Sequence, residues 1–109
     1  MDLRQKNILL SIYSSHFGNN EKEFIEYSLE NNITNYQDII QEFISIQNSV
    51  FSHILKITEP NKRLSAFEIE NECSMFCLKN HKWINEEGLK FLNKWLIWMC
   101  WHEGVLKTN

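Results

Sequence analysis

Two cysteines and a histidine, spaced four residues apart, are the residues of this chain most suited to a metal or catalytic site. Cys73, Cys77 and His81 carry the thiolate and imidazole groups that bind zinc in tetrahedral sites. On one straight helix, Cys73 and His81 would lie about 12 Å apart, too far to share an ion with Zn–S bonds of about 2.3 Å. A zinc site would require the helix to end before His81, as Asn80 allows. The alternative is that the cysteines are small buried apolar residues, and we expect no metal and no other cofactor.

A nucleophilic cysteine is the second chemistry to consider. Cys77 with His81, or Cys100 with His53, would supply a thiol and an imidazole. No cysteine-hydrolase signature surrounds these residues, and a thiol buried in apolar surroundings is inert. The chain also lacks a glycine-rich phosphate loop and an HExxH metal motif. We therefore expect that the protein is not an enzyme.

Acidic residues are concentrated along the chain, whereas basic residues are spread out. Residues 21–42 contain six acidic side chains and one basic side chain, Lys22, and three more acids follow at residues 68–72. An acidic surface attracts basic proteins and repels nucleic-acid backbones, so we expect a basic protein partner and no direct nucleic-acid binding. The alternative is a solvated helix face with an ordinary excess of glutamate. The predicted partner-binding residues are Glu21, Glu23, Glu26, Glu30, Asp38, Glu42, Glu68, Glu70 and Glu72.

Four tryptophans gather in the C-terminal third of the chain. Trp95, Trp98 and Trp101 recur every three residues, and Trp83 precedes them. Side chains of this size are usually buried in the core, but tryptophan is also a favoured anchor at protein interfaces. Trp83, which lies outside the predicted helix, and Trp101, which has polar neighbours, are the candidate anchors.

Helical periodicity accounts for nearly the whole chain, and Gly18 and the single proline, Pro60, stand between periodic segments. From Tyr36 to Ile57, apolar residues recur at alternating steps of four and three, which predicts a helix of about 23 residues. It opens at a Thr34–Gln37 capping box and is stopped by Glu59–Pro60. The four other predicted helices are about Asp2–His16, about Glu21–Glu30, Ala66 to about Lys79, and a helix that starts after Asn85 and stops at Gly104.

The last two helices have the clearest boundary signals. Ser65 and Glu68 form a capping-box pattern, and Gly104 stands where a C-terminal cap belongs. The last two turns of the C-terminal helix are apolar nearly all round, which is typical of a helix surrounded by others. We therefore expect an all-α fold, a compact bundle of about five helices with the Trp-rich C-terminal helix in its core. Residues 1–109 form a single domain.

Several features indicate the compartment. The N-terminal residues do not resemble a signal peptide. The longest apolar run, Trp95–Trp101, is far shorter than the roughly 20 residues needed to cross a bilayer. The three cysteines cannot all pair with one another, which favours a reducing setting. We expect a cytoplasmic protein that makes no contact with a membrane.

In its small size, acidic segment, aromatic content and lack of a catalytic signature, the chain resembles the small helical immunity proteins of bacteria. These proteins are paired with contact-dependent or bacteriocin toxins. The resemblance rests on overall character and on the acidic segment Glu21–Glu42, and it carries over no functional residues. It implies a protein-binding inhibitor that neutralises a basic, nuclease-type toxin of bacterial origin, with a phage-encoded nuclease inhibitor as a close variant.

Two other classes of function remain open at this point. The chain could be a structural or regulatory helical domain that forms a homodimer through exposed aromatic residues. It could also be a zinc-binding protein or an enzyme built around Cys73, Cys77 and His81.

Overall fold

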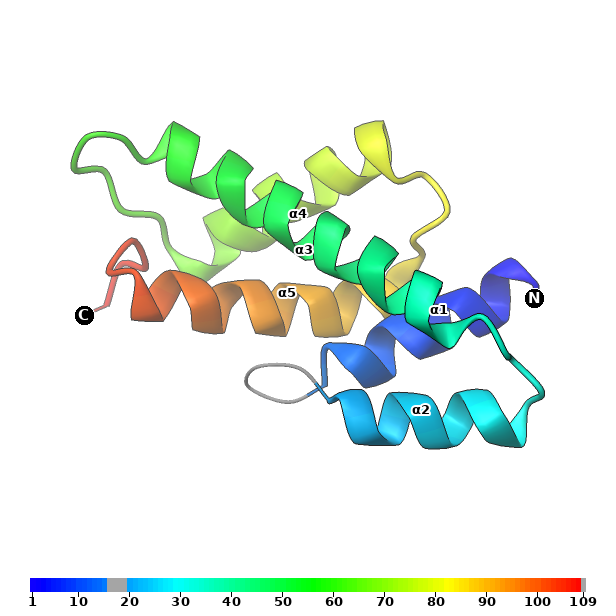
Figure 1. Cartoon of the computed structure of the whole chain (residues 1–109). Helices are drawn as coiled ribbons and strands as arrows, with labels where there is room; N and C mark the ends of the chain where they lie inside the picture. The colour runs from blue at the N-terminus through cyan, green and yellow to red at the C-terminus, as the bar shows by residue number, and fades with distance from the viewer. Residues whose placement is uncertain (16–19, 109) are drawn as a thin grey trace.

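The computed structural model describes residues 1–15 and 20–108, and that part of the chain contains five helices (Figure 1). The helices are α1 (Leu3–Tyr13), α2 (Glu21–Glu30), α3 (Tyr36–Ile57), α4 (Ala66–Asn80) and α5 (Glu86–His102). This confirms the all-α prediction. None of the helices in the described residues combines the length and apolarity that a membrane span requires.

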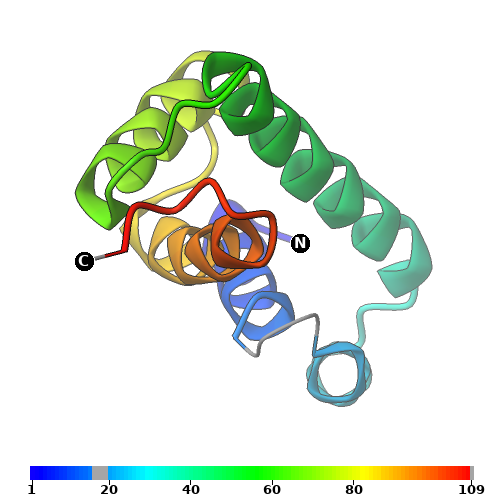
Figure 2. The same ribbon diagram turned by 90° about the vertical axis from the view of Figure 1, so that its left-hand side faces the viewer.

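Helix α5 lies at the centre of the bundle. It packs against α1, α3 and α4, and Figure 2 shows it nearly end-on with α3 and α4 above it and α1 below. Its buried side includes Leu92, Trp95, Leu96 and Cys100, which confirms a Trp-containing C-terminal helix in the core. In the last turn, the candidate anchor Trp101 is 56% exposed.

Local capping signals set most of the helix boundaries. The Asn20 side chain accepts the Glu23 backbone N–H at the start of α2. Both hydrogen bonds of the Ser65–Glu68 capping box are present at α4. Gly104, with φ of 75°, follows the end of α5 in the left-handed conformation that glycine adopts without strain. These boundaries are confirmed as predicted.

Two predicted boundaries are wrong. Helix α1 ends at Tyr13, before the expected end at His16, a residue that lies outside the described part of the chain. The Thr34–Gln37 capping box does not form, because the N-cap of α3 is Asn35 and no side chain caps this helix. The segment before α3 is instead positioned by Ile33, which is buried and whose backbone N–H donates to the Ser28 carbonyl.

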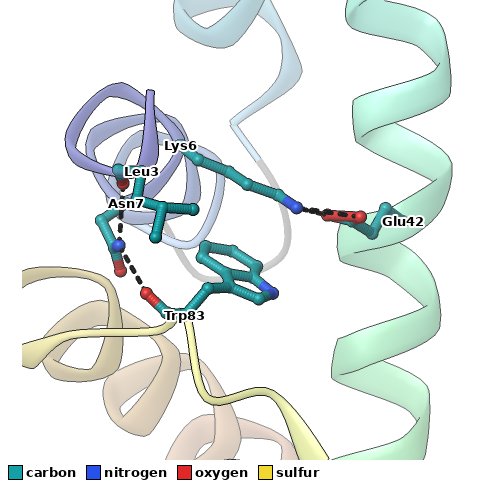
Figure 3. A network of polar contacts seen from close by, with 5 residues as sticks. All are labelled: Leu3, Lys6, Asn7, Glu42 and Trp83. Carbon is teal, nitrogen blue, oxygen red and sulfur yellow. Dashed lines mark hydrogen bonds and ion pairs between the residues drawn. The ribbon is translucent and has the colours of Figure 1, made fainter. Parts of the chain in front are cut away.

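A buried asparagine of α1 holds the beginning of α5 in place. Asn7 is 1% exposed, and its Nδ2 donates to the carbonyls of Leu3 and Trp83 at 2.9 Å each (Figure 3). Its Oδ1 accepts the backbone N–H of Asn85 at 2.8 Å. Since residues 83–85 lead directly into α5, one side chain ties the first helix to the last.

Because Gly88 has no side chain, the Asn7 side chain can pack directly against α5 at this position. A Cβ added at Gly88 would lie 2.5 Å from Asn7 Oδ1 and 3.2 Å from Leu10 Cδ2. Alanine would favour the helix by about 1 kcal/mol, but the overlap forces Asn7 out of its hydrogen bonds. We therefore expect Gly88→Ala to lower the free energy of unfolding by about 1–3 kcal/mol, the usual cost of overpacking, as measured by urea denaturation.

The same substitution in an Asn7→Ala background provides the control. The closest contact is then gone, and the helical preference of alanine should offset most of what remains. Gly88→Ala should therefore cost much less in this background than in the wild type. An equal cost in both backgrounds would show that Asn7 is not the cause.

Candidate protein-binding surfaces

Helix α2 directs three glutamates away from the rest of the molecule. Glu23, Glu26 and Glu30 follow one another at steps of three and four, so they share one side of the helix, and all three are exposed. The other side carries Phe24 and Ser28, each 0% exposed. Among the described residues, none of the three glutamates has an ion-pair partner. We call Glu23, Glu26 and Glu30 the α2 acidic face.

An aromatic contact holds this face on the bundle. The ring of Phe24 lies 5.6 Å from the Tyr13 ring and 5.9 Å from the Phe43 ring, centroid to centroid, and meets both nearly edge-on. Helix α2 packs mainly on α1 and lies at the outer edge of the molecule (Figure 2). Burial and the charge of Glu21 raise the pKa of the Tyr13 phenol, which therefore stays neutral beneath the acidic face.

The other predicted acidic residues lie on three different helices. Figures 1 and 2 place α2 and α4 on opposite sides of the molecule, so the nine residues do not form one continuous surface. Glu21 is exposed in the first turn of α2. The remaining five are Asp38 and Glu42 on α3, and Glu68, Glu70 and Glu72 on α4.

Three of these five already serve contacts within the protein. Glu42 Oε2 lies 2.6 Å from Lys6 Nζ (Figure 3). Glu72 Oε2 lies 3.0 Å from His53 Nε2. Glu68 accepts the Ser65 backbone N–H in the capping box, which lowers the pKa of its carboxyl. Their role in partner binding stays a prediction, and among the described residues the three glutamates of the α2 acidic face have no such contact.

The cysteines of α4 and α5 belong to the apolar interior. Cys73, Cys77 and Cys100 are all buried. A hydrogen bond with Cys77, together with burial, raises the pKa of Cys73 far above its usual range, and burial raises the pKa of Cys100 to about 11. The Cys73 and Cys100 thiols therefore stay protonated at neutral pH, the form that does not attack a substrate, whereas the hydrogen bond with Cys73 lowers the pKa of Cys77.

Helix α4 does end before His81, as a zinc site would need. The His81 backbone N–H donates to the Cys77 carbonyl, while its ring packs 6.0 Å from the Phe76 ring and burial lowers its pKa. No three Cys, His, Asp or Glu side chains come together as a metal site in the described residues. His53, the other histidine considered for a thiol pair, contacts Glu72 and Phe76 of α4.

The two candidate tryptophan anchors have different surroundings. The Trp83 ring stacks on Phe43 at 6.1 Å, with Lys6 Nζ 4.3 Å from its centroid (Figure 3). This packing favours a role inside the protein, although binding through Trp83 remains untested. Trp101, by contrast, is 56% exposed. It borders a shallow apolar groove lined by Lys94, Ile97, Trp98, Trp101 and Leu106.

An apolar stripe on α4 was not foreseen from the sequence. Phe67, Met75 and Leu78 are 70%, 65% and 72% exposed. They lie opposite the buried side of the helix, which carries Ile69, Cys73 and Cys77. The signal was present, because steps of eight and three residues place the three side chains on one side of a helix. The apolar residues on the buried side of the same helix made the stripe hard to distinguish in the sequence.

Comparisons with known proteins do not assign these surfaces to a family. No family model, no curated protein and no solved structure matches the chain. The surfaces themselves are therefore the basis for inferring a function.

Proposed function

We propose that this protein is an inhibitor that binds a basic protein through the α2 acidic face. Its partner would be a nuclease-type bacterial toxin, which makes the chain an immunity protein. The observation that carries the proposal is the exposure of Glu23, Glu26 and Glu30 on one side of α2, with no ion-pair partner among the described residues. Charges in this state are free to pair with lysine and arginine side chains of another protein.

A nuclease is the class of basic partner that this surface suits best. A nuclease must present positive charge to the phosphate backbone of its substrate. An acidic helix that covers this positive surface competes with the nucleic acid for the same contacts. Opposite charges also raise the association rate of the two proteins. Fast association suits an inhibitor that must bind its toxin before the toxin cleaves nucleic acid.

Charge reversal on α2 tests the proposal. We expect the triple variant Glu23→Lys, Glu26→Lys and Glu30→Lys to bind the toxin encoded by the neighbouring gene at least about 100-fold more weakly, because close charge pairs across interfaces are worth about 1.5–7 kcal/mol. Isothermal titration calorimetry measures the loss. The wild-type affinity should also fall with rising salt, since exposed charges are screened.

A matched variant separates the surface from the net charge. Glu59, Glu86 and Glu103 are exposed and lie outside α2, and reversing all three changes the total charge by the same amount. We expect this variant to bind within a few-fold of the wild type. Unchanged affinity in the α2 variant, or an equal loss in both variants, would rule out binding through the α2 acidic face. If the neighbouring genes encode no toxin, the immunity assignment fails.

A further inference from the structure

Helix α4 is apolar on both of its sides. Ile69, Cys73 and Cys77 are buried against the bundle. Phe67 and Leu78, on the outer side, are 70% and 72% exposed. Helices with apolar residues on both sides are normally covered on both, and large exposed apolar side chains gathered on one side mark a candidate interaction site. Among the described residues, the outer side of α4 thus lacks a cover.

The exposed stripe has the length of a helix–helix contact. Phe67 and Leu78 are eleven residues apart, which places them about 16 Å apart along the helix axis. Met75, 65% exposed, lies between them. Eleven residues make almost exactly three turns, so both ends of the stripe face the same direction.

Charged residues along the stripe favour one orientation of a covering helix. Glu68 and Glu72 flank the stripe near the start of α4, and Lys79 flanks it on the same side near the end, at steps of four and seven residues. A second α4 that runs antiparallel brings its Lys79 to the Glu68 of the first. In a parallel twofold pair, the charged flanks of the two α4 helices lie on opposite sides of the contact, so these residues would not meet.

We propose that this stripe is the contact surface of a homodimer, in which the α4 helices of two copies pack antiparallel. Phe67 of each copy lies against Leu78 of the other, and the twofold axis passes midway between them, level with residues 72 and 73. Such a contact uses the same patch on both copies and closes on itself. The two Lys79–Glu68 pairs at its edges set the orientation.

The flanking charges disfavour a lipid surface as the occupant. Glu68, Glu70 and Glu72 lie at the start of α4 and would be repelled by anionic headgroups. The dimer also does not depend on the proposed inhibitor function. Helices α2 and α4 lie on opposite sides of the molecule (Figures 1 and 2), so dimerisation leaves both α2 acidic faces open.

Analytical ultracentrifugation tests the proposal on the full chain. We expect the wild-type mass to rise from monomer to dimer between about 1 µM and about 1 mM, the range of modest interfaces. Leu78→Asp should remain monomeric throughout, because it buries a charge in the contact. Leu29→Asp is the matched control, since Leu29 is 59% exposed on α2 and lies outside the contact. A wild type that stays monomeric, or a Leu78→Asp variant that dimerises equally well, overturns the proposal.

The orientation has its own test in Lys79→Gln. In the antiparallel dimer this change removes an attraction, so the dissociation constant should rise by about 2- to 5-fold, as expected for a pair of exposed ion pairs. In a parallel dimer Lys79 would face no charged partner across the contact, and the dissociation constant should not change. Circular dichroism establishes that each variant is folded, and an unchanged dissociation constant would overturn the antiparallel arrangement.

Discussion

The Phe24→Ala variant is expected to lose about 3–5 kcal/mol of the free energy of unfolding. Phe24 is 0% exposed, and its ring contacts both Tyr13 of α1 and Phe43 of α3 edge-on. Truncation removes these contacts and leaves a cavity where three helices meet. Urea denaturation followed by tryptophan fluorescence and by circular dichroism measures the loss.

A substitution on the exposed side of α2 provides the comparison. Leu29 is 59% exposed, so Leu29→Ala should change stability by less than about 0.5 kcal/mol. Neither variant changes the charge of α2, so the difference between them reports on how α2 is held on the bundle. Because α2 packs mainly on α1, Phe24→Ala should increase hydrogen exchange in α2 before the rest of the bundle. A loss below about 1 kcal/mol for Phe24→Ala would mean that α2 is held by other contacts.

Features determined by neighbouring residues were predictable from the sequence. The Ser65–Glu68 capping box, the start of α5 after Asn85 and the Gly104 turn each depend on residues within three or four positions, and all are present. The length of α3 was also close to the prediction, because its apolar period continues through the whole helix. Local hydrogen bonds and periodicity are readable without knowledge of the fold.

Features determined by distant residues were not predictable. Asn7 and Asn85 are 78 positions apart, and nothing near Asn7 indicates that a polar side chain will be buried. The Thr34–Gln37 capping pattern failed for a related reason. The burial of Ile33 and its hydrogen bond to Ser28 position the chain before α3, and this contact overrides a local preference of about 1 kcal/mol.

The candidate binding surface was predictable only in part. Counting charges located the acidic segment, but it could not separate the glutamates with internal partners from those without. That separation depends on Lys6 reaching Glu42 across 36 positions and His53 reaching Glu72 across 19. The outward direction of Glu23, Glu26 and Glu30 follows from helical spacing alone, once Phe24 is recognised as the buried residue.

Asn7→Ala is expected to destabilise the protein by about 2–4 kcal/mol. The substitution leaves the Trp83 carbonyl and the Asn85 N–H without the partner that they have in the wild type. Each buried polar group that loses its partner costs about 1–3 kcal/mol. The start of α5 would also be freed from α1, so thermal and urea denaturation should both show the loss.

Asn80→Ala is the matched control for this prediction. The Asn80 side chain also donates to a helix carbonyl, that of Phe76 at 3.0 Å, but it does so at the exposed surface where water can replace it. Its loss should cost less than about 0.5 kcal/mol. Equal effects at Asn7 and Asn80 would show that burial adds nothing to the hydrogen bonds of Asn7. A large effect at Asn7 alone would show that its buried amide joins the first helix to the last. A smaller cost of Gly88→Ala in the Asn7→Ala background would show that the missing Cβ at Gly88 makes room for this amide.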